Sequence, residues 1–177
     1  MSDMRKDGAF APALARAFGA FEPVTGKVVR EAALAGLGGA VTLGVLAVCA
    51  WMAVTPLIIA PFGASCVLLF AVPASPLAQP RNVIGGHMLS ALIGIAVLAL
   101  LGPSPLAMAV AVGIAIAAMR LTGTVHPPAG ADPIVVIAAG AHWWFFAVPV
   151  GIGAAILVVC AVVYHRFVTG LPYPKAG

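Results

Sequence analysis

The sequence is poor in charge. Only 8% of its 177 residues are charged, whereas 63% are hydrophobic. Between Glu31 and Arg166, the side chains that are charged at neutral pH are Arg81, Arg120 and Asp132 alone. A membrane-spanning helix needs about 20 mainly apolar residues, so the uncharged runs 32–80, 82–119 and 133–165 predict several spans. The composition therefore excludes a soluble domain, which could not bury so much apolar surface.

Motifs for metal, redox or nucleic-acid chemistry are also lacking. Three cysteines lie inside apolar runs without CxxC spacing, as expected of small buried residues: Cys49, Cys66 and Cys160. The histidines are too scattered to argue for a metal site. The net charge of +4 comes from basic residues at the ends of apolar segments, and this distribution does not indicate nucleic-acid binding. We therefore expect no cofactor, no metal and no nucleic-acid partner. No nucleophile–base pair is visible either, so an enzyme is not expected.

The apolar runs divide into six segments, near residues 31–52, 57–72, 83–101, 105–121, 132–140 and 143–165. If all six cross and the N-terminus is cytoplasmic, four basic residues that follow the first span all fall on the cytoplasmic side: Arg81, Arg120, Arg166 and Lys175. Residues 1–30 are expected to form a cytoplasmic tail or a surface helix over about 10–21. Residues 31–166 then form one transmembrane domain, and 167–177 a cytoplasmic tail. The alternative is four full spans.

The second and fifth segments are short and interrupted by proline and glycine. Residues 61–65 (PFGAS) align with residues 128–132 (PAGAD) at an offset of 67, and an apolar run follows each. The pattern predicts two repeats, about 31–101 and 105–165, and three crossings per repeat would invert the second copy. Interrupted segments in corresponding positions of two inverted halves are typical of a transport site.

Each interrupted segment is predicted to enter as extended chain and to begin a helix in mid-membrane, near Ser65 and near Asp132. Proline disfavours helix in the residue before it, and Asp132 followed by Pro133 has the pattern of a helix start. Facing helix N-termini offer unpaired N–H groups and partial positive charge, which favour a small anion. The predicted donors are the N–H groups of 63–67 and 130–135, except proline. The predicted binding residues are Gly63, Ala64, Ser65, Cys66, Pro128, Gly130, Ala131 and Asp132, with His126 and Arg120 as secondary candidates.

Several of these residues have a second interpretation. Ser65 and Asp132 are equally suited to capping helices. A carboxylate repels an anion. Asp132 is therefore either paired with Arg120, engaged as a helix cap, or a binding group for a proton or cation. His126 is suited either to titrate near physiological pH or to donate a structural hydrogen bond to a backbone carbonyl. Arg120 has the position of a side chain that extends to the interface.

The ordered set of residues 126–133 (HPPAGADP), 61–65 (PFGAS) and 79–87 (QPRNVIGGH) resembles the HPP family of integral membrane proteins over about residues 27–168. The family is usually described as having four spans. Members in chloroplasts and cyanobacteria are associated with nitrite transport, so the resemblance implies nitrite as the leading substrate.

Together these features predict a multi-pass transporter or channel of a bacterial inner membrane, carrying a small monovalent anion. The alternatives are a cation- or proton-coupled transporter that uses Asp132, and a membrane accessory or sensor protein. The expected partners are membrane lipid and the anion, and assembly into a dimer or trimer stays open.

Overall fold

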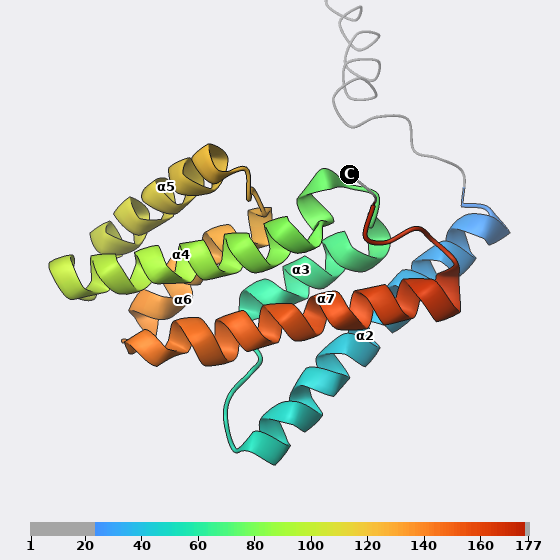
Figure 1. Ribbon diagram of the computed structural model, residues 1–177, viewed down its shortest axis with the longest axis horizontal. Coiled ribbons are helices and arrows are strands. Elements are labelled where there is room, and N and C mark those ends of the chain that lie inside the picture. The colour runs from blue at the N-terminus through green and yellow to red at the C-terminus, as the bar shows by residue number, and fades with distance from the viewer. Residues whose placement is uncertain (1–23, 176–177) are drawn as a thin grey trace, which may run out of the picture. The chain divides into compact units, whose positions relative to one another are not determined.

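The structure, a computed structural model, describes residues 24–175, and every regular element among them is helical (Figure 1). The chain separates into two compact units, residues 1–30 and 31–177. The predicted surface helix over residues 10–21 lies outside the described residues. The second unit contains all of the predicted site residues.

Four helical segments of the described chain are long and apolar enough to cross a membrane. They are α2 (Gly26–Ala53), α4 (Pro80–Leu101), α5 (Pro105–Thr122) and the C-terminal segment Trp143–Thr169. The last is continuous through η3 (Trp143–Phe146), η4 (Ala147–Ile152), α7 (Gly153–Tyr164) and η5 (His165–Thr169). These elements account for the first, third, fourth and sixth segments of the sequence prediction and define a polytopic all-helical membrane protein.

The two remaining segments are too short to span. Helix α3 (Ala60–Ala71) has 12 residues, about 18 Å at 1.5 Å per residue, against a hydrocarbon core of about 30 Å. The other short segment joins η2 (Pro127–Ala131) to α6 (Asp132–Ala138). Each follows one long helix and precedes another, as the sequence predicts for its interrupted segments. A further short element, η1 (Pro76–Ala78), connects α3 to α4.

Helix α3 begins earlier than the sequence predicts, whereas α6 begins at Asp132, where the sequence predicts a helix start. Helix α3 starts at Ala60, not near Ser65, because extended Ile59 leads directly into Pro61 in the first turn, where proline costs no hydrogen bond. Pro127 begins η2 in the same way. The predicted N-cap role of Asp132 is also wrong. Asp132 itself has helical φ and ψ of −59° and −42°, and it follows helical Ala131.

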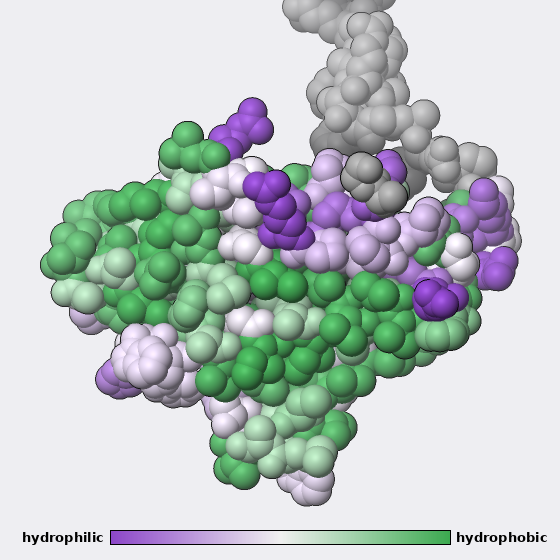
Figure 2. Space-filling model, viewed as in Figure 1, coloured by the Kyte–Doolittle hydropathy of each residue, from purple (hydrophilic) through white to green (hydrophobic). Residues whose placement is uncertain are grey.

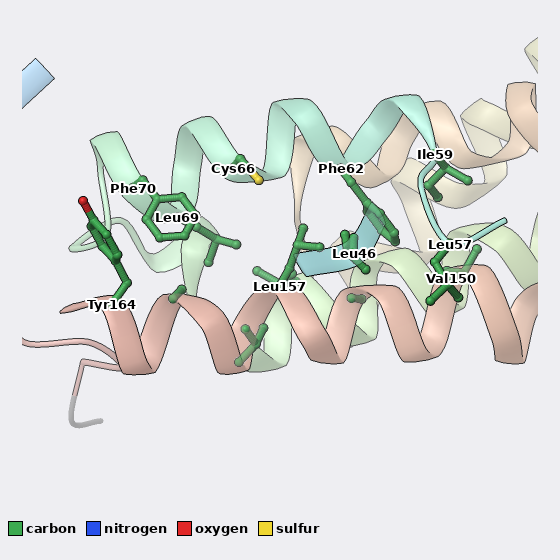
Figure 3. Packing of buried hydrophobic residues seen from close by; sticks show 14 of the residues in the cluster. Leu46, Leu57, Ile59, Phe62, Cys66, Leu69, Phe70, Val150, Leu157 and Tyr164 are labelled. Carbon is green, nitrogen blue, oxygen red and sulfur yellow. The ribbon is translucent and has the colours of Figure 1, made fainter. Parts of the chain in front are cut away.

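The apolar core holds α3 against α7. Figure 3 shows Phe62, Leu69 and Phe70 on α3 directed toward the helix that carries Leu157 and Tyr164. Phe62 is fully buried and occupies the space beside Gly153, where any Cβ would collide with its ring. Close packing of this kind, rather than exclusion from water, holds helices together in lipid. This packing determines which face of α3 contacts α4 and η2.

The surface of this unit is apolar over α4, α5 and α7 (Figure 2). Hydrophilic residues gather along one edge, where α5 ends and α4 begins. At that edge the Arg81 guanidinium donates a hydrogen bond of 2.8 Å to the Thr122 carbonyl, which ties the start of α4 to the end of α5. An apolar band bordered by a polar edge is the surface that a bilayer requires.

Candidate functional site

Four polar side chains from separate parts of the chain meet inside this apolar domain. They are Ser65 on α3, His87 on α4, His126 just before η2, and Asp132 at the start of α6, and each is 0% exposed. Polar and ionisable groups within a membrane domain are costly and are by default candidates for function. The cluster is therefore the candidate functional site.

The four side chains form one unbranched chain of short hydrogen bonds. Asp132 Oδ2 lies 2.7 Å from His87 Nδ1, and His87 Nε2 lies 2.8 Å from Ser65 Oγ. Ser65 Oγ lies 2.8 Å from His126 Nε2, and His126 Nδ1 lies 2.8 Å from the Leu77 carbonyl oxygen. A longer contact of 3.2 Å joins Ser65 Oγ to the Pro61 carbonyl. The two imidazole rings are 4.9 Å apart at their centroids.

The loop that carries His126 is held in place from α4. The Asn82 amide donates to the Val125 carbonyl at 2.9 Å. One turn further along, a Cβ on Gly86 would lie 2.8 Å from the His126 Cβ and 2.9 Å from the Thr124 carbonyl. Helix α5 stops just before this loop because Gly123 takes the left-handed conformation, with φ of 67°, which glycine adopts without strain. Glycine at 86 thus lets the His126 loop approach α4 closely.

Helix α4 also positions the other end of the cluster. The Ser90 hydroxyl, fully buried, donates to the Ala129 carbonyl at 2.6 Å. Further along, a Cβ on Gly94 would lie 2.8 Å from the Pro133 Cα. These contacts place η2 and the start of α6 along α4 from Gly86 to Gly94, so the cluster reaches the middle of that helix. Asp132 therefore lies far from either end of α4.

Asp132 is paired with His87 and not with Arg120. The His87–Asp132 contact is fully buried, whereas Arg120 is exposed in the last turn of α5. Within the part of the chain that the structure describes, Asp132 Oδ1 is buried without a hydrogen-bond partner. One carboxylate oxygen is thus satisfied by the imidazole, and the other is free to accept a proton or a bound group.

Of the predicted binding residues, the structure brings together Ser65, His126 and Asp132. The others contribute no side chain to the hydrogen-bonded cluster. Ala64, Pro128 and Ala131 line a separate apolar groove of about 660 Å³ between α3 and the η2–α6 segment. Gly63 and Cys66 border a second groove toward α2. Gly130 has open space at the position of a Cβ.

The predicted backbone donors of α3 are mostly unavailable to a ligand. Because α3 begins at Ala60, N–H groups from residue 64 onward fall beyond the first turn, where each is bonded to a carbonyl four residues earlier. Phe62 N–H already donates to the Ile59 carbonyl, and Ala129 N–H to that of His126. The donors at this site are therefore side chains more than helix ends.

His87 is the residue of the candidate site that the sequence prediction missed. It lies 22 residues from Ser65 and 45 from Asp132 in the chain, so no local spacing connects them. A signal nevertheless existed, because His87 is an ionisable residue within the otherwise uncharged run 82–119. It also ends the segment 79–87 that carries the family resemblance. Phe62 packs edge-on against its ring, with centroids 5.1 Å apart.

The sequence prediction found no nucleophile–base pair, and the structure forms one. Ser65, His87 and Asp132 have the connectivity of a hydroxyl nucleophile, a base and an orienting carboxylate. Ser65 is nevertheless wholly enclosed and lies inside a regular helix, where its hydroxyl also contacts His126 and the Pro61 carbonyl. Its position differs from the exposed, sharply turned serine of a hydrolase.

A buried polar cluster between two short helices, in a chain with four helices long and apolar enough to span a membrane, defines a polytopic membrane protein with an internal ionisable site. The family described as HPP, transmembrane region, matches residues 25–174. The chain therefore belongs to the HPP family.

Two curated relatives are transmembrane proteins of Dictyostelium discoideum. One is 38% identical over 125 residues, covering 66% of this chain and 44% of the relative. The other is 34% identical over 128 residues, covering 68% of this chain and 41% of the relative. The chain thus spans less than half the length of these curated relatives. No solved structure matches the chain significantly.

Proposed function

We propose that the chain is a transporter or channel for a small monovalent anion, with nitrite as the leading candidate. The observation that carries the proposal is the fully buried cluster of Ser65, His87, His126 and Asp132 where two short helices meet. Ionisable side chains that face the interior of a membrane bundle mark ion and substrate pathways.

The arrangement of long and short helices supports transport rather than a purely structural role. Helices α2, α3 and α4 follow the order long, short, long, and α5, η2–α6 and the segment Trp143–Thr169 follow the same order. We interpret these as two inverted repeats, about 31–101 and 105–165, with α3 and η2–α6 as the interrupted segments. Transporters commonly place their substrate site at such a repeat interface.

The groove between the short helices supports an anionic substrate. First-turn residues of both segments border it: Ala60 and Pro61 on α3, and Pro127 and Pro128 on η2. The positive ends of both helices therefore lie at one apolar groove, which favours a small, weakly hydrated anion. We further propose a bacterial inner membrane, cytoplasmic termini, and a homo-oligomer of two or three copies. A cation pathway through Asp132 and an accessory or sensor role are the competing outcomes.

Nitrite uptake by the full-length chain in proteoliposomes tests the function. We expect uptake above that of protein-free vesicles. His126→Ala should reduce the rate of nitrite uptake about tenfold or more. The substitution removes a buried hydrogen-bonding side chain, and a hydrogen bond to a charged group contributes about 1.5–3 kcal/mol. Gly130→Leu should also reduce uptake, because it adds a bulky side chain to η2, between the cluster residues His126 and Asp132, without a clash at Cβ.

Gly113→Leu on α5 is the matched control, since a Cβ there also meets nothing within 4 Å. It should leave uptake unchanged. Wild-type uptake equal to that of empty vesicles would refute the function. Full uptake by both site variants would instead refute the location of the site. Reversal potentials under a salt gradient give the sign of the permeant ion.

The Ser65–His87–Asp132 geometry makes a membrane serine hydrolase the second candidate. We propose that the chain is not a hydrolase, because the enclosed Ser65 hydroxyl leaves no approach for a carbonyl substrate. The full-length protein should therefore remain unlabelled by a fluorophosphonate probe that modifies a serine hydrolase control in the same detergent. Labelling that Ser65→Ala abolishes would establish a hydrolase instead.

A further inference from the structure

The hydrogen-bond chain at the site has a fixed direction at its His126 end. At one end the Leu77 carbonyl can only accept, so His126 Nδ1 carries a hydrogen. A neutral His126 then presents a bare Nε2 to Ser65, 2.8 Å away. The Ser65 hydroxyl must therefore donate to His126, because two lone pairs at that distance would repel each other.

The middle of the chain then requires one additional proton. Ser65 has a single hydroxyl hydrogen, and donation to His126 at 2.8 Å uses it in preference to the Pro61 carbonyl at 3.2 Å. Ser65 Oγ must accept from His87, so His87 Nε2 carries a hydrogen. His87 Nδ1 lies 2.7 Å from Asp132 Oδ2, and this contact also needs a hydrogen. The pair therefore holds one proton more than a neutral His87 beside an ionised Asp132, either as an imidazolium with a carboxylate or as a neutral imidazole with a carboxylic acid.

Removing a hydrogen from this network leaves an unsatisfied contact. If His87 kept a hydrogen only on Nδ1, then Ser65 would face two bare Nε2 atoms with one hydroxyl hydrogen. A buried polar contact without its hydrogen is expensive in a site that water does not reach. Protonation of His126 at Nε2 would restore every bond in the opposite direction. The cluster is thus complete in two arrangements, each with the same number of protons.

We propose that Asp132, His87, Ser65 and His126 bind one exchangeable proton and relay it between the His87–Asp132 pair and His126, making the proton a co-substrate of transport. The co-substrate role rests on the proposed anion transport, whereas the proton relay rests on the geometry of the cluster alone. A proton that accompanies a monovalent anion would make the combined movement electrically neutral.

The transfer step balances within the cluster. The His87 Nε2–H bond breaks as a new Oγ–H bond forms on Ser65. The original Ser65 Oγ–H bond breaks as an Nε2–H bond forms on His126. His87 then keeps its Nδ1 hydrogen toward Asp132, Ser65 remains a hydroxyl, and His126 carries the positive charge. The reverse transfer runs through the same two hydrogen bonds without rotation of the Ser65 hydroxyl, whose new hydrogen already points to His87 Nε2, and no oxidant or other reactant takes part.

Few other titratable or charged groups adjoin the relay on the elements packed around it. Arg81 on α4 donates to the Thr122 carbonyl and is exposed. Cys66 on α3 belongs to the apolar core. His165, on η5, bonds the Leu69 carbonyl further along α3. The charge of the relayed proton is therefore balanced chiefly by Asp132, whose Oδ1 has no partner among the described residues.

The two ends of the relay lie at different depths. His126 bonds to Leu77 in η1, which is half-buried and lies just before the start of α4. Asp132 adjoins Pro133, which packs against Gly94 well inside α4. A proton that reaches His126 from the polar edge of the domain would thus be delivered toward the middle of the bundle.

Nitrogen-15 NMR of histidine-labelled full-length protein in lipid nanodiscs tests the relay without reference to transport. We expect His126 to carry hydrogen on Nδ1, and His87 to show an Nε2–H shared with Ser65. Ser65→Ala should change the resonances of both histidines. Thr42→Val removes a hydroxyl that is also buried but lies on α2, outside the hydrogen-bonded cluster, and should leave the histidine tautomers unchanged. Two neutral histidines that are insensitive to Ser65→Ala would overturn the relay.

Proteoliposomes that contain a pH-sensitive dye test the co-substrate role. At neutral pH, nitrite uptake should acidify the lumen, and an imposed inward proton gradient should drive nitrite accumulation. Protein-free vesicles measure the leak of undissociated nitrous acid. Ser65→Ala should abolish the accumulation, whereas Thr42→Val should retain it. Nitrite flux that does not depend on the proton gradient would overturn only the coupling of nitrite transport to the proton. Absence of nitrite flux would overturn the anion-transport proposal, and the NMR measurement would still decide the relay.

Discussion

Asp132→Ala is expected to lower the free energy of unfolding by about 3–5 kcal/mol, because it removes one partner of a buried pair and leaves the other unpaired. His87 is 0% exposed, and Asp132 Oδ2 is the only partner of its Nδ1 in the described chain. Without the carboxylate, His87 Nδ1 is buried with no partner in the described chain, although its Nε2–H can still donate to Ser65. Steric-trap or SDS unfolding in a defined detergent measures the loss.

The double variant His87→Leu, Asp132→Leu separates stability from function. Apolar replacement of both members of a buried pair is often neutral or stabilising, so most of the lost stability should return. Proton-linked nitrite uptake should not return, because the proton-binding pair is absent. If Asp132→Ala unfolds with the wild-type free energy, the His87–Asp132 pair does not form in the membrane. Recovery of coupled uptake in the double variant would refute the role of the pair.

Gly94→Leu is expected to abolish nitrite uptake and to lower stability by about 1–3 kcal/mol or more, the usual cost of overpacking a tight contact. A Cβ at this position would lie 2.8 Å from the Pro133 Cα and 3.2 Å from the Val136 Cβ. Since the obstacle includes backbone, α6 must move away from α4. Asp132 precedes Pro133 directly, so the movement would lengthen its 2.7 Å bond to His87.

Gly113→Leu again serves as the control, because Gly113 is a helical glycine like Gly94 but has open space at Cβ. It should change neither uptake nor the unfolding free energy appreciably. Uptake and thermal stability of the two variants, measured in the same detergent and vesicles, decide the outcome. A Gly94→Leu protein with normal uptake would show that α6 need not stay against α4 for transport.

The sequence predicted those elements that local composition controls. Uncharged runs of adequate length led to the four long helices, and Pro61 and Pro128 marked the two short ones. The predicted limits of 105–121 for the fourth segment match α5, Pro105–Thr122, within one residue. The start of α6 at Asp132 matches the prediction. The start of α3 and the turn η2 were predicted less well, because proline is also accepted in a first helical turn, and this is where Pro61 and Pro127 lie.

The site was predicted in part. Ser65, His126 and Asp132 were singled out for their place beside the interrupted segments, and they do meet. His87 was passed over, and Arg120 was considered in its place as a partner for Asp132. Both errors have one cause, since the partner of a buried carboxylate is chosen by how helices cross and not by distance along the chain.

By itself, then, the sequence determined that this protein lies in a membrane, with two helices too short to span, because hydrophobic length and proline act locally. Only the tertiary structure decided which polar groups satisfy one another. Glycines 86 and 94 let the His126 loop and α6 lie against α4, and that close approach brings one serine, two histidines and one aspartate into a single hydrogen-bonded chain. The physical reason is the apolar surroundings, in which a buried polar group must find its partner within the fold.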